Sequence, residues 1–342
     1  MRKKQRVTIA DIARLAGVSA GAVSFALNGK AGVSEVTRRR ILEVAATENW
    51  RPNSSARALT GGRVNVVGFV VNRPARSLGT EAFFAEMISG IQSGLAGSHT
   101  AMHMLVVPSL ADELKTYQEW WNSQRVDGVI LLDPCTDDPR LELLASLGLN
   151  AVLIGSHPAA AGTAASVWVD DTLAAETLFG YLGALGHRRI AHITGNAEFE
   201  HSALRAAVLK RSQVQYGLET TATIPTTYQP EQAERATRQL LSQPVRPTAI
   251  VYDNDVMAVA GLGVVLEMGL TVPGDVSIAT FDDSVLARLV RPSITSLTRD
   301  TFELGELAAA TLLAQIDAPT LIESVAAPQP TLTVRDSTSP PR

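Results

Sequence analysis

The sequence of 342 residues is 46% hydrophobic and 19% charged, a composition typical of globular proteins that excludes a disordered chain. Residues 1–63 carry twelve Lys or Arg against four Asp or Glu, a charge of +8, whereas the rest carries −12 and the whole −4. A basic head on an acidic body is the charge pattern of a protein that binds a polyanion through one module.

The first predicted helix begins after Thr8, whose side chain can cap it, and Asp11 three residues later can complete a capping box. Apolar residues at helical spacing follow, and Gly17 supplies the positive φ that ends the helix. Ser19 caps a second helix after a turn of only a few residues, and Ser34 caps a third. Two short helices joined this tightly predict a helix-turn-helix.

The second helix is predicted to enter the major groove of DNA. Val23, Ala26 and Leu27 fall on one side of it and face the core. The other side carries small residues and Phe25, with hydroxyl and amide groups that suit phosphate contacts. The alternative is an ordinary helical hairpin with an exposed phenylalanine. The candidate DNA-facing residues of this helix are Ser19, Gly21, Ser24, Phe25 and Asn28.

Residues 53–60 are predicted to form a second DNA contact. Asn53 caps a helix that is too short to be stable alone, so we expect it to form only when something packs on it. Ala56 lets two copies approach closely, and Leu59 beside Arg57 suits an apolar wedge in the minor groove. A paired hinge helix that folds on DNA is therefore expected here.

Residues 7–59, VTIADIARLAGVSAGAVSFALNGKAGVSEVTRRRILEVAATENWRPNSSARAL, resemble the DNA-binding head and hinge helix of the lactose-repressor (LacI/GalR) family of bacterial transcription regulators. The resemblance implies that Ala20, Gly21 and Phe25 read the major groove. It also implies backbone contacts from Thr8, Ser19, Ser24 and Asn28, and minor-groove contacts from Ala56 and Leu59. The sequence departs from the family pattern at Ala22, where threonine is common, and at Phe25, where arginine is common.

From Val64 onward, short apolar segments alternate with amphipathic ones. Apolar strands with helices between them predict a parallel sheet covered on both faces. The strands are too many for one sheet of ordinary size, so we expect two doubly wound α/β lobes and a frayed tail at residues 336–342. The predicted strands are Val64–Val71, Ala101–Val107, Gly128–Leu132, Ala151–Ile154, Val167–Val169, Arg189–Thr194, Ala249–Tyr252 and Val276–Phe281. The predicted helices include Glu81–Leu95, Leu110–Asn122, Thr172–Leu185, Pro230–Leu241, Asp255–Met268 and Phe302–Ile316.

Ligands of such sheets bind beyond the carboxyl ends of the strands, and polar residues gather there in this sequence. Asn254 and Asp282 each follow a predicted strand, and His201 and Arg205 begin the helix after another. With the aromatic pair at residues 83–84, they could orient a small polar molecule. The alternatives are a surface arginine at 205 and ordinary turn formers at 254 and 282.

The body resembles the periplasmic-binding-protein-like ligand domain of the same family, through LGHRRIAHITG, RPTAIVYDNDVMAVAGLGVVLEMGLTVPGDVSIATFDD and PSITSLTRD. The sequence departs from the family at Glu81-Ala82, where Asn-Pro is usual. A core position for Phe84 and a structural role for Tyr228 remain alternatives. The resemblance implies effector contacts by Arg205, Asn254 and Asp282, stacking by Phe84, and ligand-facing positions for His201 and Tyr228.

Catalytic motifs are missing from the sequence. GLGVVL at residues 261–266 lacks the third glycine of a dinucleotide fingerprint and falls inside a predicted helix. We find no Walker loop, HExxH, GxSxG or zinc-spaced Cys/His cluster, so we expect no catalytic residue, metal or cofactor. A small-molecule-binding or sugar-processing α/β protein without operator control is the alternative reading.

The sequence also indicates the compartment. The single cysteine, Cys135, excludes a disulfide within the chain. The basic start has no apolar segment after it, and the longest apolar run, residues 256–266, is too short to span a bilayer. We therefore expect a cytoplasmic protein with no membrane partner.

These observations predict a ligand-responsive transcription factor, most simply a repressor. We expect a helix-turn-helix domain over residues 1–60, with its hinge helix at about 53–60. An effector-binding and dimerisation domain should cover residues 64–342. The expected partners are a palindromic DNA operator, a small effector such as a sugar or sugar derivative, and a second copy of the chain. No leucine heptads follow residue 335, which favours a homodimer over the family's tetramers.

Overall fold

The computed structural model describes residues 7–27, 31–48, 50, 63–319 and 323–342. The chain divides into two compact units, Met1–Val64 and Asn65–Arg342, and each is described by itself. The first is the head and the second is the body.

Within residues 7–27 and 31–48 the head is a bundle of three helices, as the sequence predicts. The Thr8 hydroxyl accepts from Asp11 N at 3.3 Å, and Asp11 Oδ2 accepts from Thr8 N at 2.9 Å, so the capping box is formed. Gly17 ends the first helix with φ 65°, and the first two helices meet at 102°, an angle typical of a helix-turn-helix. The helices are α1 (Ile9–Ala16), α2 (Ala20–Leu27) and α3 (Glu35–Thr47).

Apolar side chains from all three helices form the core of the head. Ile12, Val23 and Ile41 are fully buried, one from each helix. The side chain of Arg38 donates from Nη1 to the Ala26 carbonyl at 3.1 Å and so joins α3 to the end of α2. Burial on this side leaves the opposite side of α2 to solvent.

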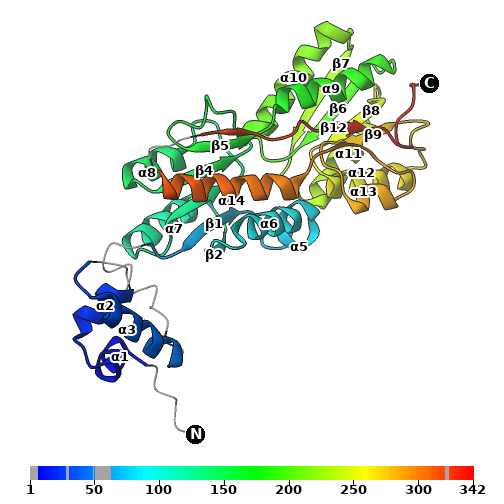
Figure 1. Cartoon of the computed structure of the whole chain (residues 1–342). Helices are drawn as coiled ribbons and strands as arrows, with labels where there is room; N and C mark the ends of the chain where they lie inside the picture. The colour runs from blue at the N-terminus through cyan, green and yellow to red at the C-terminus, as the bar shows by residue number, and fades with distance from the viewer. Residues whose placement is uncertain (1–6, 28–30, 49, 51–62, 320–322) are drawn as a thin grey trace. The chain divides into compact units, whose positions relative to one another are not determined.

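The body contains two six-stranded sheets, each with helices on both faces (Figure 1). In the N-terminal lobe the strand order is β11-β5-β4-β3-β1-β2, and all its described pairings are parallel. Its strands are β1 (Val66–Asn72), β2 (Ala101–Val107), β3 (Gly128–Leu131), β4 (Asn150–Ile154), β5 (Ala165–Trp168) and β11 (Val325–Ala326). Its helices are α5 (Ser77–Thr80), α6 (Ala82–Leu95), α7 (Leu110–Asn122), α8 (Pro139–Leu147) and α14 (Thr301–Asp317).

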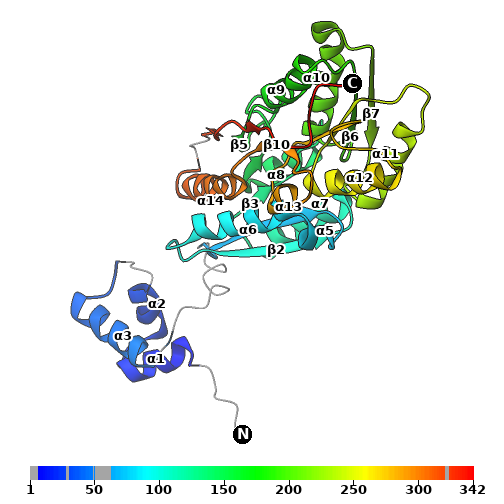
Figure 2. The same cartoon turned by 90° about the vertical axis from the view of Figure 1, so that its right-hand side faces the viewer.

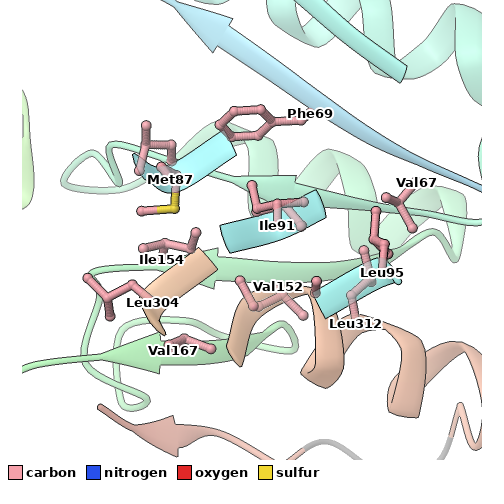
Figure 3. Packing of buried hydrophobic residues seen from close by; sticks show 14 of the residues in the cluster. Val67, Phe69, Met87, Ile91, Leu95, Val152, Ile154, Val167, Leu304 and Leu312 are labelled. Carbon is pink, nitrogen blue, oxygen red and sulfur yellow. The ribbon is translucent and has the colours of Figure 1, made fainter. Parts of the chain in front are cut away.

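Helices α6 and α14 lie side by side on one face of the N-terminal sheet (Figure 2). Their apolar side chains, among them Met87, Ile91 and Leu312, meet those of the strands in one buried cluster (Figure 3). The two helices approach closely because glycine stands at the contact. A Cβ at Gly90 would lie 2.0 Å from the Phe302 carbonyl oxygen.

The C-terminal lobe has the strand order β12-β10-β9-β8-β6-β7, parallel except where β12 pairs with β10. Helices α9 and α10 share one apolar cluster with this sheet, and α11 and α12 share another. Its strands are β6 (Arg189–Thr194), β7 (Thr220–Pro225), β8 (Ala249–Tyr252), β9 (Ser277–Thr280), β10 (Thr295–Thr298) and β12 (Thr331–Thr333). Its helices are α9 (Asp171–Ala184), α10 (Glu200–Tyr216), α11 (Pro230–Leu241), α12 (Asp255–Glu267) and α13 (Val285–Leu289).

The chain passes between the lobes three times: after β5, after β10 and after β11. The segment that follows β12 corrects one expectation, because residues 336–342 are not frayed. Ser337 is fully buried, its N–H donates to the Ser293 carbonyl at 3.0 Å, and its carbonyl accepts from Ile278 N at 2.9 Å. The Ser337 hydroxyl also accepts from Thr295 N at 2.8 Å and donates to the Ile278 carbonyl at 2.6 Å, so this residue anchors the tail beside β9.

Within the described ranges no single helix is long and apolar enough to span a membrane. The bent pair α1 and α2 reaches the required length and composition only when the two helices are added together.

Candidate functional site

The exposed side of α2 presents small residues and one aromatic ring. Ser19, Ala20 and Gly21 are exposed, Phe25 is 44% exposed, and Ser24 is half-buried. The Ser19 hydroxyl accepts from Ala22 N at 3.2 Å and so caps the helix. This surface has the form that the sequence predicts for the DNA-reading side of a helix-turn-helix.

The structure adds a contact for Phe25 that the sequence did not indicate. A Cβ at Gly32 would lie 3.2 Å from Phe25 Cδ2, so the ring leans on the turn that follows α2. Gly32 has φ +114°, a conformation that glycine tolerates best. The ring therefore lies against Gly32 and is still partly exposed to solvent. Thr8 is exposed and engaged in its capping box. Asn28, Asn53, Ala56, Arg57 and Leu59 lie outside the described residues.

A cavity of about 80 Å³ lies between the two lobes of the body, at the carboxyl ends of their strands. Charged side chains line it together with aromatic and aliphatic ones. The residues are Arg73, Glu81, Phe83, Leu132, Asp133, Pro134, Ile154, Gly155, Val167, Val169, Asp171, His201, Arg205, Tyr228, Asp253, Asp282, Arg299 and Leu304.

Arg205 is held rigidly by two carboxylates. Its Nη1 donates to Asp253 Oδ1 at 3.0 Å and its Nη2 to Asp171 Oδ1 at 3.1 Å. Asp253 Oδ2 also accepts from Thr194 Oγ1 at 2.6 Å and from Gly195 N at 2.8 Å. Burial alone would raise the pKa of Asp253, but Arg205, His192 and the hydrogen bond with His192 together hold that pKa well below its usual range. The guanidinium therefore faces the cavity in a fixed orientation.

Arg73 crosses from the N-terminal lobe to aromatic rings of the C-terminal lobe. Its guanidinium carbon lies 3.9 Å from the centre of the Tyr228 ring and 4.8 Å from that of Phe199. Arg73 Nε donates to Asp133 Oδ2 at 2.8 Å, within its own lobe. Tyr228 adopts φ 64°, and its hydroxyl lies 2.7 Å from His201 Nε2. These contacts close one side of the cavity and join the lobes.

Two lining carboxyl groups have raised pKa values. Burial raises the pKa of Glu81 to about 7, and burial raises that of Asp282 to about 6. Glu81 accepts from Asn254 Nδ2 at 3.2 Å, but its other oxygen is buried without a hydrogen-bond partner among the described residues. Asp282 meets Arg299 only at 3.6 Å. Burial, followed by Arg205, lowers the pKa of His201 to about 4, so His201 is neutral near pH 7.

The structure places four of the six predicted effector residues at the cavity: His201, Arg205, Tyr228 and Asp282. Phe84 is corrected, because it is 1% exposed and packs in the core of the N-terminal lobe, whereas Phe83 lines the cavity. Successive residues of a helix point about 100° apart, so only one ring of the pair can face the ligand.

Asn254 is also placed differently from the prediction. Its Oδ1 accepts from Met257 N at 2.9 Å and caps α12, and its Nδ2 contacts Glu81. It lies behind the lining residue Glu81 and is absent from the cavity wall. Its strand-end position therefore serves a helix cap and a link between lobes.

Sequence reasoning missed six charged lining residues. Five of them follow a strand within three residues, so the rule that found Asp282 points to them. The sixth, Glu81, immediately precedes α6. The five are Arg73, Asp133, Asp171, Asp253 and Arg299. No group of three or more His, Cys, Asp or Glu side chains in the described part of the chain could hold a metal ion.

A helix-turn-helix joined to a two-lobed ligand-binding body defines a DNA-binding protein with a small-molecule site. Comparison with known sequences gives the same division. Residues 8–53 match the model for bacterial regulatory proteins of the lacI family, and residues 179–338 match a periplasmic binding protein-like domain.

The relatives are transcriptional regulators. The ribose operon repressor of Escherichia coli (strain K12) is 28% identical over 92% of this chain and 94% of its own. A LacI family regulator from Bifidobacterium animalis subsp. lactis DSM 10140 is 32% identical, with a TM-score of 0.75 over 82% of this chain and all of its own. A complex of the transcriptional regulator CelR with cellobiose is 27% identical, with a TM-score of 0.73 over 97% of this chain and all of its own. The chain belongs to the LacI family of bacterial transcriptional regulators.

Proposed function

We propose that the protein is a repressor that binds a palindromic operator as a homodimer and whose operator affinity is set by a small metabolite in the cavity between the lobes. One observation supports the proposal: a helix-turn-helix and a cavity lined by charged side chains between two lobes occur in one chain. A two-fold dimer presents two equal reading helices, which is why the matching DNA site is palindromic.

The effector in this proposal is a sugar or a sugar derivative. The lining offers guanidinium, carboxylate and phenol groups for hydroxyls, with Phe83 and Tyr228 as flat apolar surfaces. Relatives whose names refer to ribose and cellobiose support this class. A cavity of about 80 Å³ is smaller than the roughly 300 Å³ that ligand sites usually offer. Uptake of a sugar therefore requires the lobes to part or the lining to shift.

The ligand acts on DNA through the arrangement of the lobes. A molecule that contacts Arg205 and Asp282 on one lobe and Glu81 on the other stabilises the arrangement in which all three reach it. Residues 53–60 connect the head to the first strand of the N-terminal lobe, so a lobe shift changes the spacing of the two hinge segments in the dimer. In this proposal Asn53, Ala56, Arg57 and Leu59 contact DNA only when the hinge helices are paired.

The proposal also covers the compartment of the protein and what happens to the bound effector. The protein works in the cytoplasm, where an operator is accessible, and it binds its effector without converting it. A sugar-processing enzyme is the competing function. Chemical turnover of any sugar that binds the cavity would favour it.

Operator binding and ligand binding test the proposal together. DNase footprinting of the full-length protein should reveal a protected palindrome, with affinity that falls steeply as salt rises because phosphate contacts release counterions. A thermal-shift screen of sugars and related metabolites should identify a ligand that raises Tm. The same ligand should change operator affinity. A ligand that binds without changing operator affinity would contradict the proposal.

A further inference from the structure

The charges of the cavity do not balance. Three arginines line it. Carboxylates accept hydrogen bonds from Arg73 and Arg205, whereas Arg299 lies 3.6 Å from Asp282 and its Nε has no hydrogen-bond partner among the described residues. Arg73 pairs with Asp133 at 2.8 Å, and Arg205 pairs with Asp171 and Asp253 at 3.1 and 3.0 Å. Two further carboxyl groups also line the cavity, so ionised side chains would leave a surplus of two negative charges.

Glu81 contributes one of the two surplus carboxyl groups. Its side chain is 7% exposed, it lines the cavity, and its Oε1 is buried with no hydrogen-bond partner among the described residues. Its described side-chain hydrogen bonds come from neutral groups, the Asn254 amide at 3.2 Å and the Ser77 side chain. A buried carboxylate without a partner is strongly disfavoured, so it must take up a proton or meet a donor that the ligand supplies.

Asp282 contributes the second surplus carboxyl group, from the C-terminal lobe. Its described ion pair is with Arg299 Nε at 3.6 Å, longer than a hydrogen bond, and Arg299 also lies 3.9 Å from Asp171. His201 adds no positive charge near neutral pH, because burial lowers its pKa to about 4. Both lobes therefore turn toward the same small cavity a carboxyl group that accepts no described hydrogen bond from a charged side chain.

We propose that the effector carries a positively charged amine that donates to Glu81 Oε1, with Asp282 adding to the attraction, and that the cavity rejects anionic effectors. The proposal rests on the proposed function in that it takes the cavity as the effector site. A uronate or a sugar phosphate would face the two surplus carboxyl groups, which outnumber the one lining guanidinium, that of Arg299, without a hydrogen-bonded carboxylate. An amino sugar keeps the hydroxyls that the polar lining suits and supplies the missing cation.

The test uses matched sugars that differ in one charged group. Glucosamine, glucose, N-acetylglucosamine and glucuronate, with the corresponding galactose series, are compared by thermal shift and calorimetry on the full-length protein at about pH 7, where amines remain mostly protonated. The proposal predicts that an amino sugar raises Tm and binds about tenfold or more tightly than its neutral analogues, and that the uronates do not bind. Equal or tighter binding of neutral or anionic members overturns it, and so does a panel in which no amine binds.

Two variants separate a specific role of Glu81 from a general effect. Glu81→Gln keeps the shape and loses the charge, so amine affinity should fall about tenfold or more while any binding of the neutral analogue is unchanged. Glu234→Gln removes an exposed carboxylate from α11 and should behave as wild type. Amine binding that survives in Glu81→Gln contradicts the proposal.

Operator affinity is measured separately in the same samples. Amine binding that depends on Glu81 but leaves operator affinity unchanged would support this inference and refute the proposed function. A neutral or acidic sugar that binds more tightly than its amine and changes operator affinity would support the proposed function and refute this inference. The two failures are therefore distinguishable.

Discussion

Asn254 Nδ2 donates to Glu81 Oε2 across 3.2 Å, and this hydrogen bond joins the C-terminal lobe to the N-terminal lobe beside the ligand cavity. Asn254 caps α12, and Glu81 immediately precedes α6. The ends of two helices from different lobes thus meet at one carboxyl group. Any ligand that competes for Glu81 acts on a contact between lobes.

The stability of the ligand-free protein should depend on pH through Glu81. Its folded pKa of about 7 lies above the ordinary 4.5, so the folded state holds the proton more tightly than the unfolded state. The resulting stabilisation is complete below about pH 4.5 and is lost as the pH rises to about 7, on the order of 3 kcal/mol. Urea unfolding from about pH 5 to about pH 8 should show this loss in wild type and not in Glu81→Gln. If the free energy of unfolding changed with pH in the same way in both proteins, the raised pKa of Glu81 would be refuted.

Asp253 should be essential for the structure of the cavity. It accepts hydrogen bonds from Thr194, Gly195 and Arg205, and all of its partners are buried. Asp253→Ala leaves the Arg205 guanidinium short of one carboxylate, so the free energy of unfolding should fall by about 3–5 kcal/mol. Denaturant titration measures this, with Asp112→Ala on the surface of the other lobe as a milder control. A loss below about 1 kcal/mol would show that the network is not structural.

Two glycines of the body should respond oppositely to the same substitution. Gly90→Ala places a methyl group 2.0 Å from the Phe302 carbonyl oxygen, where α6 meets α14. We expect a loss of about 1–3 kcal/mol or more in unfolding free energy. Gly263→Ala on α12 meets nothing within 4 Å and should gain up to about 1 kcal/mol. Similar effects of both substitutions would contradict the close helix contact.

Phe25 should contribute to specific DNA recognition. Its ring is 44% exposed and steadied by Gly32 on one side. Phe25→Ala should weaken operator binding by about 1–3 kcal/mol and leave binding to random DNA nearly unchanged. Leu42→Ala, which removes another exposed apolar side chain of the head at 47% exposure, should affect neither. Fluorescence anisotropy on operator and random duplexes measures both affinities, and equal losses on the two DNAs would argue against base contact.

Much of the fold was predictable because periodicity and capping signals were strong. The sequence predicts the bounds of α7, α11, β2, β6 and β8 as the structure has them. It misses β7, β10, β11 and β12, which are short or rich in threonine and so lack a continuous apolar run. It also misses the pairing of Ser337, because a polar tail carries no signal for the backbone partners that it finds only in the folded sheet.

The site was predictable in position more than in detail. The rule that ligands bind at strand ends found Asp282 and Arg205, but it could not choose between Phe83 and Phe84 or between Asp253 and Asn254. Neighbouring residues at a strand end point in different directions. Which of them faces the cavity depends on how the opposite lobe packs, and that information is not local.

Control of operator binding from the cavity is tested most directly by one comparison. Operator affinity of the full-length protein is measured by anisotropy with and without the sugar that raises Tm most, for wild type and for Asp282→Ala. We predict a change of about tenfold or more in wild type, and none in the variant, which should still bind the operator with wild-type affinity. An operator affinity that stays constant in wild type at saturating ligand, or a variant that responds as wild type does, would contradict the account.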